Sequence, residues 1–165
     1  MSRIRGLFSK AMPEAIPEIS LLFDLFVTSN RIRRLVEEVL QDAPLRGEEY
    51  AVYSLLFDHG PLTATEMRRA LAMPLSTLLD HLRAMEDRGH LRRRPHPRDG
   101  RAQQLSLTLE GTTQHRLTNA FWEPMHQALD QALPVPAEQV RASLRALDQA
   151  ARSALAARDE AASAG

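Results

Sequence analysis

The segment from Leu62 to Leu107 constrains the fold of this chain more than any other part of the sequence. Two short amphipathic stretches are followed by a glycine, and then by two stretches that can form a β-hairpin around the polar turn Pro97-Arg98-Asp99-Gly100-Arg101. Residues 62–102 contain nine arginines and five acidic residues, and residues 88–101 contain six arginines and one acidic residue. Two short helices joined to a basic hairpin are typical of proteins that grip DNA in two grooves.

The composition limits what the rest of the chain can do. Its 165 residues are enough for one domain with a hydrophobic core. The formal net charge is zero, which argues against indiscriminate nucleic-acid binding but allows the local excess of +4 within residues 62–102. There is no cysteine, so disulfides, thiolate metal sites, a cysteine nucleophile and thiol-based redox sensing are excluded. No apolar run has the length of a membrane span and no secretory signal is present, so we expect a cytoplasmic protein.

The spacing of apolar residues predicts two helices before the central segment. Residues 18–41 form the first, and its apolar arc is too wide for a lone surface helix, which points to a partner chain. Residues 48–57 form the second and supply core side chains, Tyr53 and Phe57 among them, before His59-Gly60-Pro61 ends it.

The two short helices of the central segment carry start and stop signals. Thr63, with Glu66 three residues later, predicts a capping box for a helix that turns Met67, Ala70 and Leu71 inward. The next helix opens at Pro74 and ends at Gly89, which takes a left-handed conformation. Its buried stripe is expected at the spacing i, i+3, i+7 and i+10 and comprises Leu75, Leu78, Leu82 and Met85.

Strands and helices follow in the order expected for a winged structure. Residues 90–95 and 102–107 predict two strands, with Leu91, Leu105 and Leu107 on the core side. Thr108 caps a helix that runs to about residue 133 and contains Pro124, where we expect a kink. The last helix begins at about residue 137.

The fold class is therefore mainly α with a small β-hairpin wing. We expect a winged helix-turn-helix at residues 45–108, flanked by long dimerisation helices at 18–42 and 109–158. We also expect a flexible arm at residues 1–17 and a disordered tail at residues 159–165.

This order of elements resembles that of the MarR family of multidrug- and aromatic-responsive transcriptional regulators, over roughly residues 18–155. The most specific part is MEDRGHLRRRPHPRDGRAQQLSLTLEG, from Met85 to Gly111. It contains the family's Arg-Gly, Arg-rich strand, Asp-Gly-Arg-type wing tip and Leu-Thr-x-x-Gly strand exit. His96 stands where the family has an Asp, so one carboxylate that could brace the wing is lost. The ArsR family is the alternative, because LSTLLDHLRAM is similar to its recognition helix, but the long terminal helices and the absence of cysteine favour MarR.

The recognition helix that begins near Pro74 is expected to enter the major groove with its N-terminal residues nearest the bases. For Asp80, the alternative to DNA contact is an ion pair with Arg83. For Ser76 and Thr77, capping of the helix start is an alternative of equal weight to DNA contact. A plain surface histidine is the alternative for His81. The candidate DNA-contacting residues of this helix are Ser76, Thr77, Asp80, His81 and Arg83.

The wing provides a second set of candidates. Arginines at a wing tip can enter a narrow minor groove, which makes Arg98 and Arg101 the strongest of them, with a solvated charged turn as the alternative. The resemblance suggests that Asp99 pairs with and orients one of these two. Arg92, Arg93 and Arg94 cannot all face one way on a strand, so we expect one or two to reach phosphates and another to pair internally. The candidates in the wing are Arg92, Arg94, Arg98, Asp99 and Arg101.

Catalytic and metal-binding motifs are missing from the sequence. The six histidines form no chelating pair, and there is no phosphate-binding loop, nucleophile elbow or clustered carboxylate pair. We therefore expect no enzyme, no metal site and no cofactor.

The resemblance implies a homodimeric repressor that binds a pseudo-palindromic operator in double-stranded DNA. It also implies release by a small phenolic or aromatic-acid effector bound between the dimer helices and the DNA-binding lobe. The candidate effector-binding residues are Phe23, Phe26, Arg33, Tyr53 and Trp122, with Tyr50, Phe121 and Arg31 as further possibilities. A helical dimer that acts through protein partners, with a degenerate wing, is the alternative from a different class.

Overall fold

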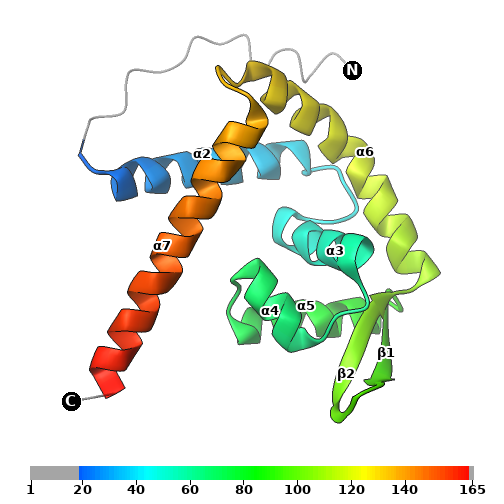
Figure 1. Ribbon diagram of the computed structural model, residues 1–165. Coiled ribbons are helices and arrows are strands. Elements are labelled where there is room, and N and C mark those ends of the chain that lie inside the picture. Colours follow the sequence, from blue (N-terminus) through cyan, green and yellow to red (C-terminus); the bar gives the residue numbers. More distant parts are fainter. Residues whose placement is uncertain (1–18, 164–165) are drawn as a thin grey trace. The chain divides into compact units, whose positions relative to one another are not determined.

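The computed structural model describes residues 19–163, which form six helices and one two-stranded antiparallel sheet within that range (Figure 1). The chain divides into two compact units, one ending at Met125 and the other beginning at His126. The elements are α2 (Leu21–Val39), α3 (Gly47–His59), α4 (Ala64–Leu71), α5 (Leu75–Asp87), β1 (Leu91–His96), β2 (Asp99–Leu107), α6 (Leu109–Ala132) and α7 (Ala137–Ser163). The expected fold class, mainly helical with a hairpin wing, is confirmed.

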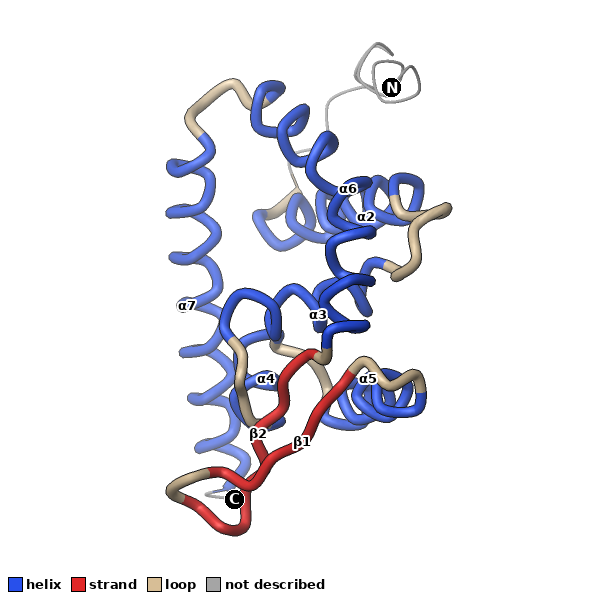
Figure 2. The backbone as a smooth tube through the Cα atoms, turned by 90° about the vertical axis from the view of Figure 1, so that its right-hand side faces the viewer, coloured by secondary structure: helices blue, strands red, loops and turns tan. Residues whose placement is uncertain are grey.

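The first unit is organised around one hydrophobic core under α3, α4, α5 and the hairpin. Val52, Tyr53, Met67, Leu78 and Leu82 have no exposed surface and lie at its centre. Figure 2 shows β1 and β2 side by side, extending away from the short helices as a wing. The remaining core residues, all less than a tenth exposed, are Leu40, Leu45, Tyr50, Leu56, Met85, Leu91 and Leu105.

Local sequence signals start and stop these helices as expected. The Thr63 side chain accepts a hydrogen bond from the Glu66 amide at 3.2 Å, and the Glu66 carboxylate accepts one from the Thr63 amide at 2.7 Å. This capping box satisfies amide groups that the helix itself leaves free. Gly89 follows α5 with a φ of 71°, and Thr108 caps α6 by accepting a hydrogen bond from the Gly111 amide.

One backbone contact was not expected from the sequence. Leu62, just before α4, pairs with Leu105 of β2 through two backbone hydrogen bonds of 3.0 and 2.7 Å. Leu105 is buried, so the segment that opens the helix-turn-helix is tied to the base of the wing. The two short helices and the hairpin therefore form one packed structure.

Three residues expected in the core are exposed. Leu75, the first residue of α5, is 45% exposed, because helical side chains lean toward the N-terminus and this one projects past the start of the helix. Phe57 is 40% exposed although its ring stacks on His115, and Ala70 also faces solvent. The sequence spacing was correct for the stripe of Leu78, Leu82 and Met85.

The boundaries of the terminal helices also differ from those expected. The first helix covers Leu21–Val39 instead of 18–41, and the last reaches Ser163, so residues 159–163 are helical and the expected tail is wrong there. Pro124 lies inside α6, and the helix continues past it to Ala132. The arm expected at residues 1–17 lies outside the described residues.

His115 joins α6 to α3 through a stack of three rings. Its imidazole is 5% exposed and lies against Tyr50, with ring centroids 5.2 Å apart, and against Phe57, with centroids 4.2 Å apart. Its Nε2 atom is 3.2 Å from the Ser54 hydroxyl. Burial lowers the pKa of His115 from its ordinary value of 6.5, with Arg116 acting in the same direction and Asp58 opposing it.

We predict that His115 makes the fold sensitive to acid. Because its folded pKa lies below that of the unfolded chain, the unfolded state binds more protons as the pH falls below about 6.5. The free energy of unfolding should therefore decrease between about pH 7 and pH 5. His115→Phe keeps the ring stack and removes the titrating group, so urea unfolding at a series of pH values should give a shallower slope.

The exposed His59 provides a control for the loss of a histidine. The His59→Asn variant should keep the slope of the parent protein. Burial also lowers the pKa of His90, so part of the slope should remain in His115→Phe. Identical slopes for the parent and His115→Phe would show that this site does not carry the effect.

Candidate nucleic-acid interface

The exposed face of α5 carries polar side chains. Ser76, Asp80 and Arg83 are all exposed, as expected for a face turned away from the core. Arg83 and Asp80 form an ion pair with an N–O distance of 3.1 Å, which is the alternative considered for this aspartate. The pair is largely solvated, so it holds the two side chains only weakly in this position.

Two other candidates on α5 are less accessible. Thr77 is half-buried, and His81 turns toward α3, where its Nε2 lies 3.9 Å from a carboxylate oxygen of Glu48. The His81 Nε2 atom is buried and makes no hydrogen bond within the described residues. His81 therefore lies at the edge between α5 and α3 and not on the open face of the recognition helix.

The three consecutive arginines of β1 alternate in direction, as the strand geometry requires. Arg92 and Arg94 are exposed and lie opposite Ser106 and Gln104 of β2. Arg93 points the other way and donates from Nε to both carboxylate oxygens of Glu86, at 2.9 and 3.1 Å. The expected division into external and internally paired arginines is therefore present.

The tip of the wing is held by two side chains that accept hydrogen bonds from the backbone. Asp99 Oδ1 accepts from the Arg101 amide at 3.0 Å, and His96 Nδ1 accepts from the Arg98 amide at 3.2 Å. The expectation that Asp99 orients an arginine side chain is wrong, because its partner is the Arg101 main chain. His96, which replaces the family's carboxylate, still supplies an acceptor at this position.

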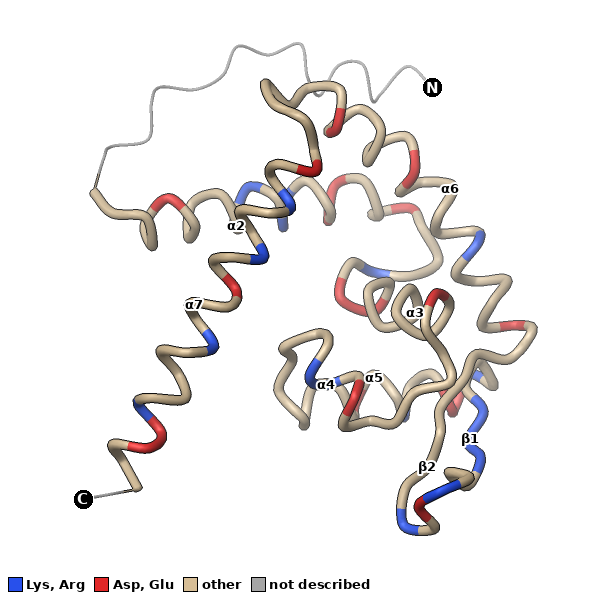
Figure 3. The backbone as a smooth tube through the Cα atoms, viewed as in Figure 1, with Lys and Arg blue, Asp and Glu red and all other residues tan. Residues whose placement is uncertain are grey.

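The guanidinium groups at the tip of the wing are exposed. Among residues 19–163, neither Arg98 nor Arg101 has an ion-pair partner. Figure 3 shows that basic positions follow β1 and recur at the end of the hairpin. These charges are exposed on a wing whose base is packed into the core. Such an arrangement is suited to binding a polyanion.

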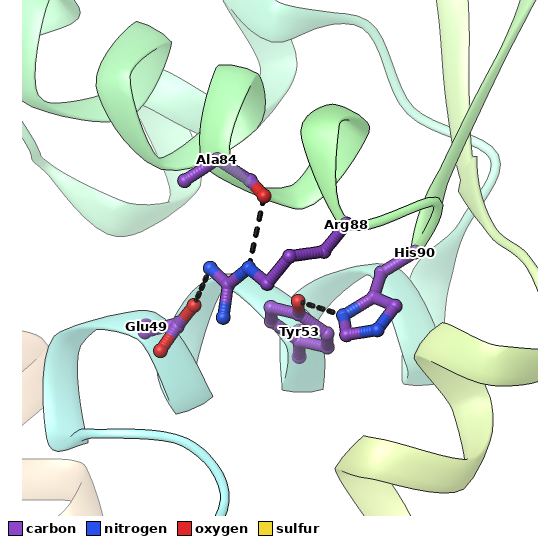
Figure 4. A network of polar contacts seen from close by, with 5 residues as sticks. All are labelled: Glu49, Tyr53, Ala84, Arg88 and His90. Carbon is purple, nitrogen blue, oxygen red and sulfur yellow. Dashed lines mark hydrogen bonds and ion pairs between the residues drawn. The ribbon is translucent and has the colours of Figure 1, made fainter.

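A network of polar contacts fixes the end of α5 and the start of β1 against α3 (Figure 4). Arg88 donates from Nε to the Ala84 carbonyl at 2.9 Å and pairs with Glu49 of α3. The Tyr53 hydroxyl and His90 Nδ1 share a hydrogen bond of 2.8 Å. Burial raises the pKa of Tyr53 to about 12 and lowers the pKa of His90, so both groups are uncharged at neutral pH.

The residues expected to bind an effector differ in their exposure. Tyr53 has no exposed surface, and its hydroxyl shares a hydrogen bond with His90. Trp122 packs on the core beside Tyr50, with ring centroids 5.5 Å apart. Phe23 is half-buried on α2, whereas Phe26 and Arg33 of the same helix are exposed.

Two long helices present apolar surface to solvent. Neither α2 nor α7 contains a buried residue, and both carry large hydrophobic side chains that are more than a third exposed. On α2 and just before it these are Ile19, Leu21, Leu22, Leu25, Phe26 and Ile32, and on α7 they are Leu144 and Leu155.

The described residues contain neither a metal-binding cluster nor a membrane-spanning helix. Across residues 19–163, no group of three or more His, Cys, Asp or Glu side chains is placed to share a metal ion. Within the same range, no helix combines the length and apolar character needed to cross a bilayer.

Comparison with known proteins gives one family and one curated relative. The MarR family model matches residues 47–102, which include α3, α4, α5 and most of the wing. The relative is the organic hydroperoxide resistance transcriptional regulator of Bacillus subtilis (strain 168), 29% identical over 94 residues. That match covers 57% of this chain and 64% of the relative, so it spans less than two thirds of the relative's length.

Solved structures share the fold over most of their length. A DNA complex of MepR from S. aureus superposes with a TM-score of 0.70 and 20% identity, covering 82% of this chain and 99% of MepR. The PcaV transcriptional regulator from Streptomyces coelicolor, in complex with its natural ligand, gives a TM-score of 0.63 and 20% identity, covering 87% of this chain and 99% of PcaV.

These comparisons favour the MarR resemblance over the ArsR alternative, and they agree with the expectation that the chain is not an enzyme. The matched residues coincide with the helix-turn-helix and wing described above. Over residues 47–102 the chain is similar to the MarR family of winged helix-turn-helix transcriptional regulators.

Proposed function

We propose that this chain is a sequence-specific DNA-binding transcriptional regulator that acts in the cytoplasm as a homodimeric repressor. The observation that carries the proposal is the wing, whose exposed arginines extend beside a helix with a polar open face. A wing in the minor groove and a helix in the adjacent major groove would bind duplex DNA together.

The two parts of the interface would contribute differently. Arg98 and Arg101 would enter the minor groove, where a narrow groove has an enhanced negative potential. Arg92 and Arg94 would contact phosphates, which add affinity without reading sequence. Ser76, Thr77 and the Asp80–Arg83 pair would face base edges or phosphates in the major groove. Asp99 and His96 would hold the shape of the wing tip.

The proposed role of the wing predicts a change in salt dependence. An arginine in the minor groove neutralises the charge of the phosphates on either side of the groove and so releases counterions on binding. The double variant Arg98→Ala, Arg101→Ala should therefore bind any duplex more weakly. The slope of log K against log salt should become shallower by about one unit per lost contact. Fluorescence anisotropy with operator fragments selected from genomic DNA, over a range of salt concentrations, measures both quantities.

Arg93→Ala is the matched control for this experiment. It removes an arginine charge from the same hairpin, but from a side chain that is bound to Glu86. Its salt slope should stay close to that of the parent protein. An unchanged slope in the double variant would refute the assignment of the wing, and a parent protein that selects no fragment would refute the DNA-binding function.

The homodimer is supported by the exposed apolar side chains of α2 and α7. Most helix stability in proteins comes from packing of an apolar face, and neither helix buries a single residue in one copy of the chain. A second copy related by a two-fold axis would cover these faces and place two recognition helices roughly 34–36 Å apart. The operator would then be a pseudo-palindrome.

Charged residues in the exposed apolar stripe of α7 should weaken the dimer. Leu144 and Leu155 are 54% and 58% exposed, so Leu144→Asp with Leu155→Asp should leave the single chain folded. Because two leucines that the dimer would bury are lost, the dissociation constant of the dimer should rise at least about tenfold. Sedimentation velocity across a concentration series measures this, with Gln149→Asp, an exposed polar position on α7, as the control. A monomeric parent protein would contradict the dimer.

A small-molecule effector is also part of the proposal. PcaV, similar in fold, was crystallised with its natural ligand, and the relative in B. subtilis is named for organic hydroperoxides. This chain has no cysteine, so it cannot respond to a hydroperoxide through a thiol. We therefore favour an aromatic carboxylate, with Phe23, Phe26 and Trp122 as apolar contacts and Arg33 as its charged partner.

An effector of this class should release the protein from its operator. Titration of the protein–operator complex with hydroxybenzoates should lower DNA affinity by about 5-fold to 150-fold, the usual range of allosteric coupling. Arg33→Ala should raise the concentration required, and Arg34→Ala on the same helix, where the guanidinium pairs with Glu38, is the control. No response to any aromatic acid would contradict this class of effector.

A further inference from the structure

Leu75 is an unusual residue at the exposed N-terminal end of the recognition helix. It is 45% exposed, whereas Leu78 and Leu82, which share its helical stripe, have no exposed surface. Within α5 it is the one large hydrophobic side chain that is more than a third exposed. The core therefore does not account for a leucine at this position.

The position of Leu75 is the one from which a recognition helix reads bases. It is the first residue of α5, next to the exposed Ser76, and its side chain leans past the start of the helix. Recognition helices contact base edges mainly through their N-terminal residues. A leucine here can make no hydrogen bond, so its contribution to recognition must come from apolar contact.

Only one base presents an apolar group in the major groove. Thymine carries a C5-methyl group there, and the other three bases present hydrogen-bond donors and acceptors. An isobutyl side chain placed against a donor or acceptor would remove it from water without replacing its hydrogen bond, which is unfavourable. The chemistry of Leu75 therefore matches thymine and disfavours cytosine at the same place.

We propose that Leu75 reads the methyl group of one thymine in each half of the operator, an inference that rests on the DNA-binding function proposed above. The neighbouring Asp80 and Arg83 bind each other in the free protein, so part of their hydrogen-bonding capacity is already used. Leu75 needs no rearrangement, because its exposed surface is available in this conformation. It is a specificity-determining contact and adds little to the salt-dependent affinity.

Deoxyuridine provides a probe that differs from thymine only by the methyl group. We would replace each thymine of the selected operator by deoxyuridine, one symmetric pair at a time, and measure the affinity of the parent protein. At the pair read by Leu75, loss of one methyl contact should weaken binding by about fourfold per half-site. Both half-sites together should give about fifteenfold.

The same scan with variants assigns the effect to Leu75. Leu75→Ala should bind the thymine operator less tightly and lose the deoxyuridine effect at that pair. Leu75→Met keeps an apolar side chain of similar volume, so it should retain the effect. Arg98→Ala should weaken binding to every operator and retain the full effect, because it acts through a different groove. Thermal unfolding of each variant checks that the fold is intact.

The outcomes separate this proposal from the function on which it rests. A deoxyuridine effect that is present in the parent protein and in Arg98→Ala, but absent in Leu75→Ala, would support the contact. Specific binding without any deoxyuridine effect, or with the same effect in Leu75→Ala, would overturn the role of Leu75 and leave the DNA-binding function standing. A parent protein that binds no DNA fragment would overturn both.

Discussion

The attachment of α5 to α3 determines where every side chain of the candidate interface points. Leu78, Leu82 and Met85, all on one side of α5, have no exposed surface, and their burial fixes the rotation of the helix about its own axis. Arg88 then ties the last turn of α5 to Glu49 of α3. Because β1 begins three residues after Arg88, the direction of the wing depends on the same attachment.

The wing combines a fixed base with an exposed tip. Leu62 binds Leu105 through the backbone, and Leu91 and Leu105 are buried in the core, so the base of the hairpin belongs to the same packed structure as the short helices. Toward the tip, local hydrogen bonds that the side chains of Asp99 and His96 accept from backbone amides define the turn. The arginines are thus presented at a defined distance from the core, while their side chains keep the freedom to adapt to a groove.

Most of the fold could be predicted because its signals are local. The capping box of Thr63 and Glu66, the left-handed Gly89 and the alternation of the arginines on β1 depend on residues close together in the sequence. Contacts between distant segments were not predicted, since spacing within one element says nothing about its partner. Glu49 and Arg88 are 39 residues apart, and the ring stack around His115 joins two helices that no sequence pattern connects.

The candidate site was predicted less completely than the fold, for the same reason. Residue spacing predicts the direction of side chains inside a helix or strand, but it is less informative for residues at the ends. The exposure of Leu75 and the main-chain partner of Asp99 were therefore not predicted. Tyr53 was placed in an effector site because aromatic residues serve both in pockets and in cores, and only burial distinguishes the two.

The distribution of charge has a consequence for how the molecule meets a polyanion. Residues 62–102 carry a net charge of +4, which leaves −4 for the rest of a neutral chain. A neutral body with separated charges has an electric dipole, and in the field around DNA such a body is turned more strongly than it is pulled. Approach would therefore align the wing with the duplex before contact, without the long-lived nonspecific attachment that a large positive net charge produces.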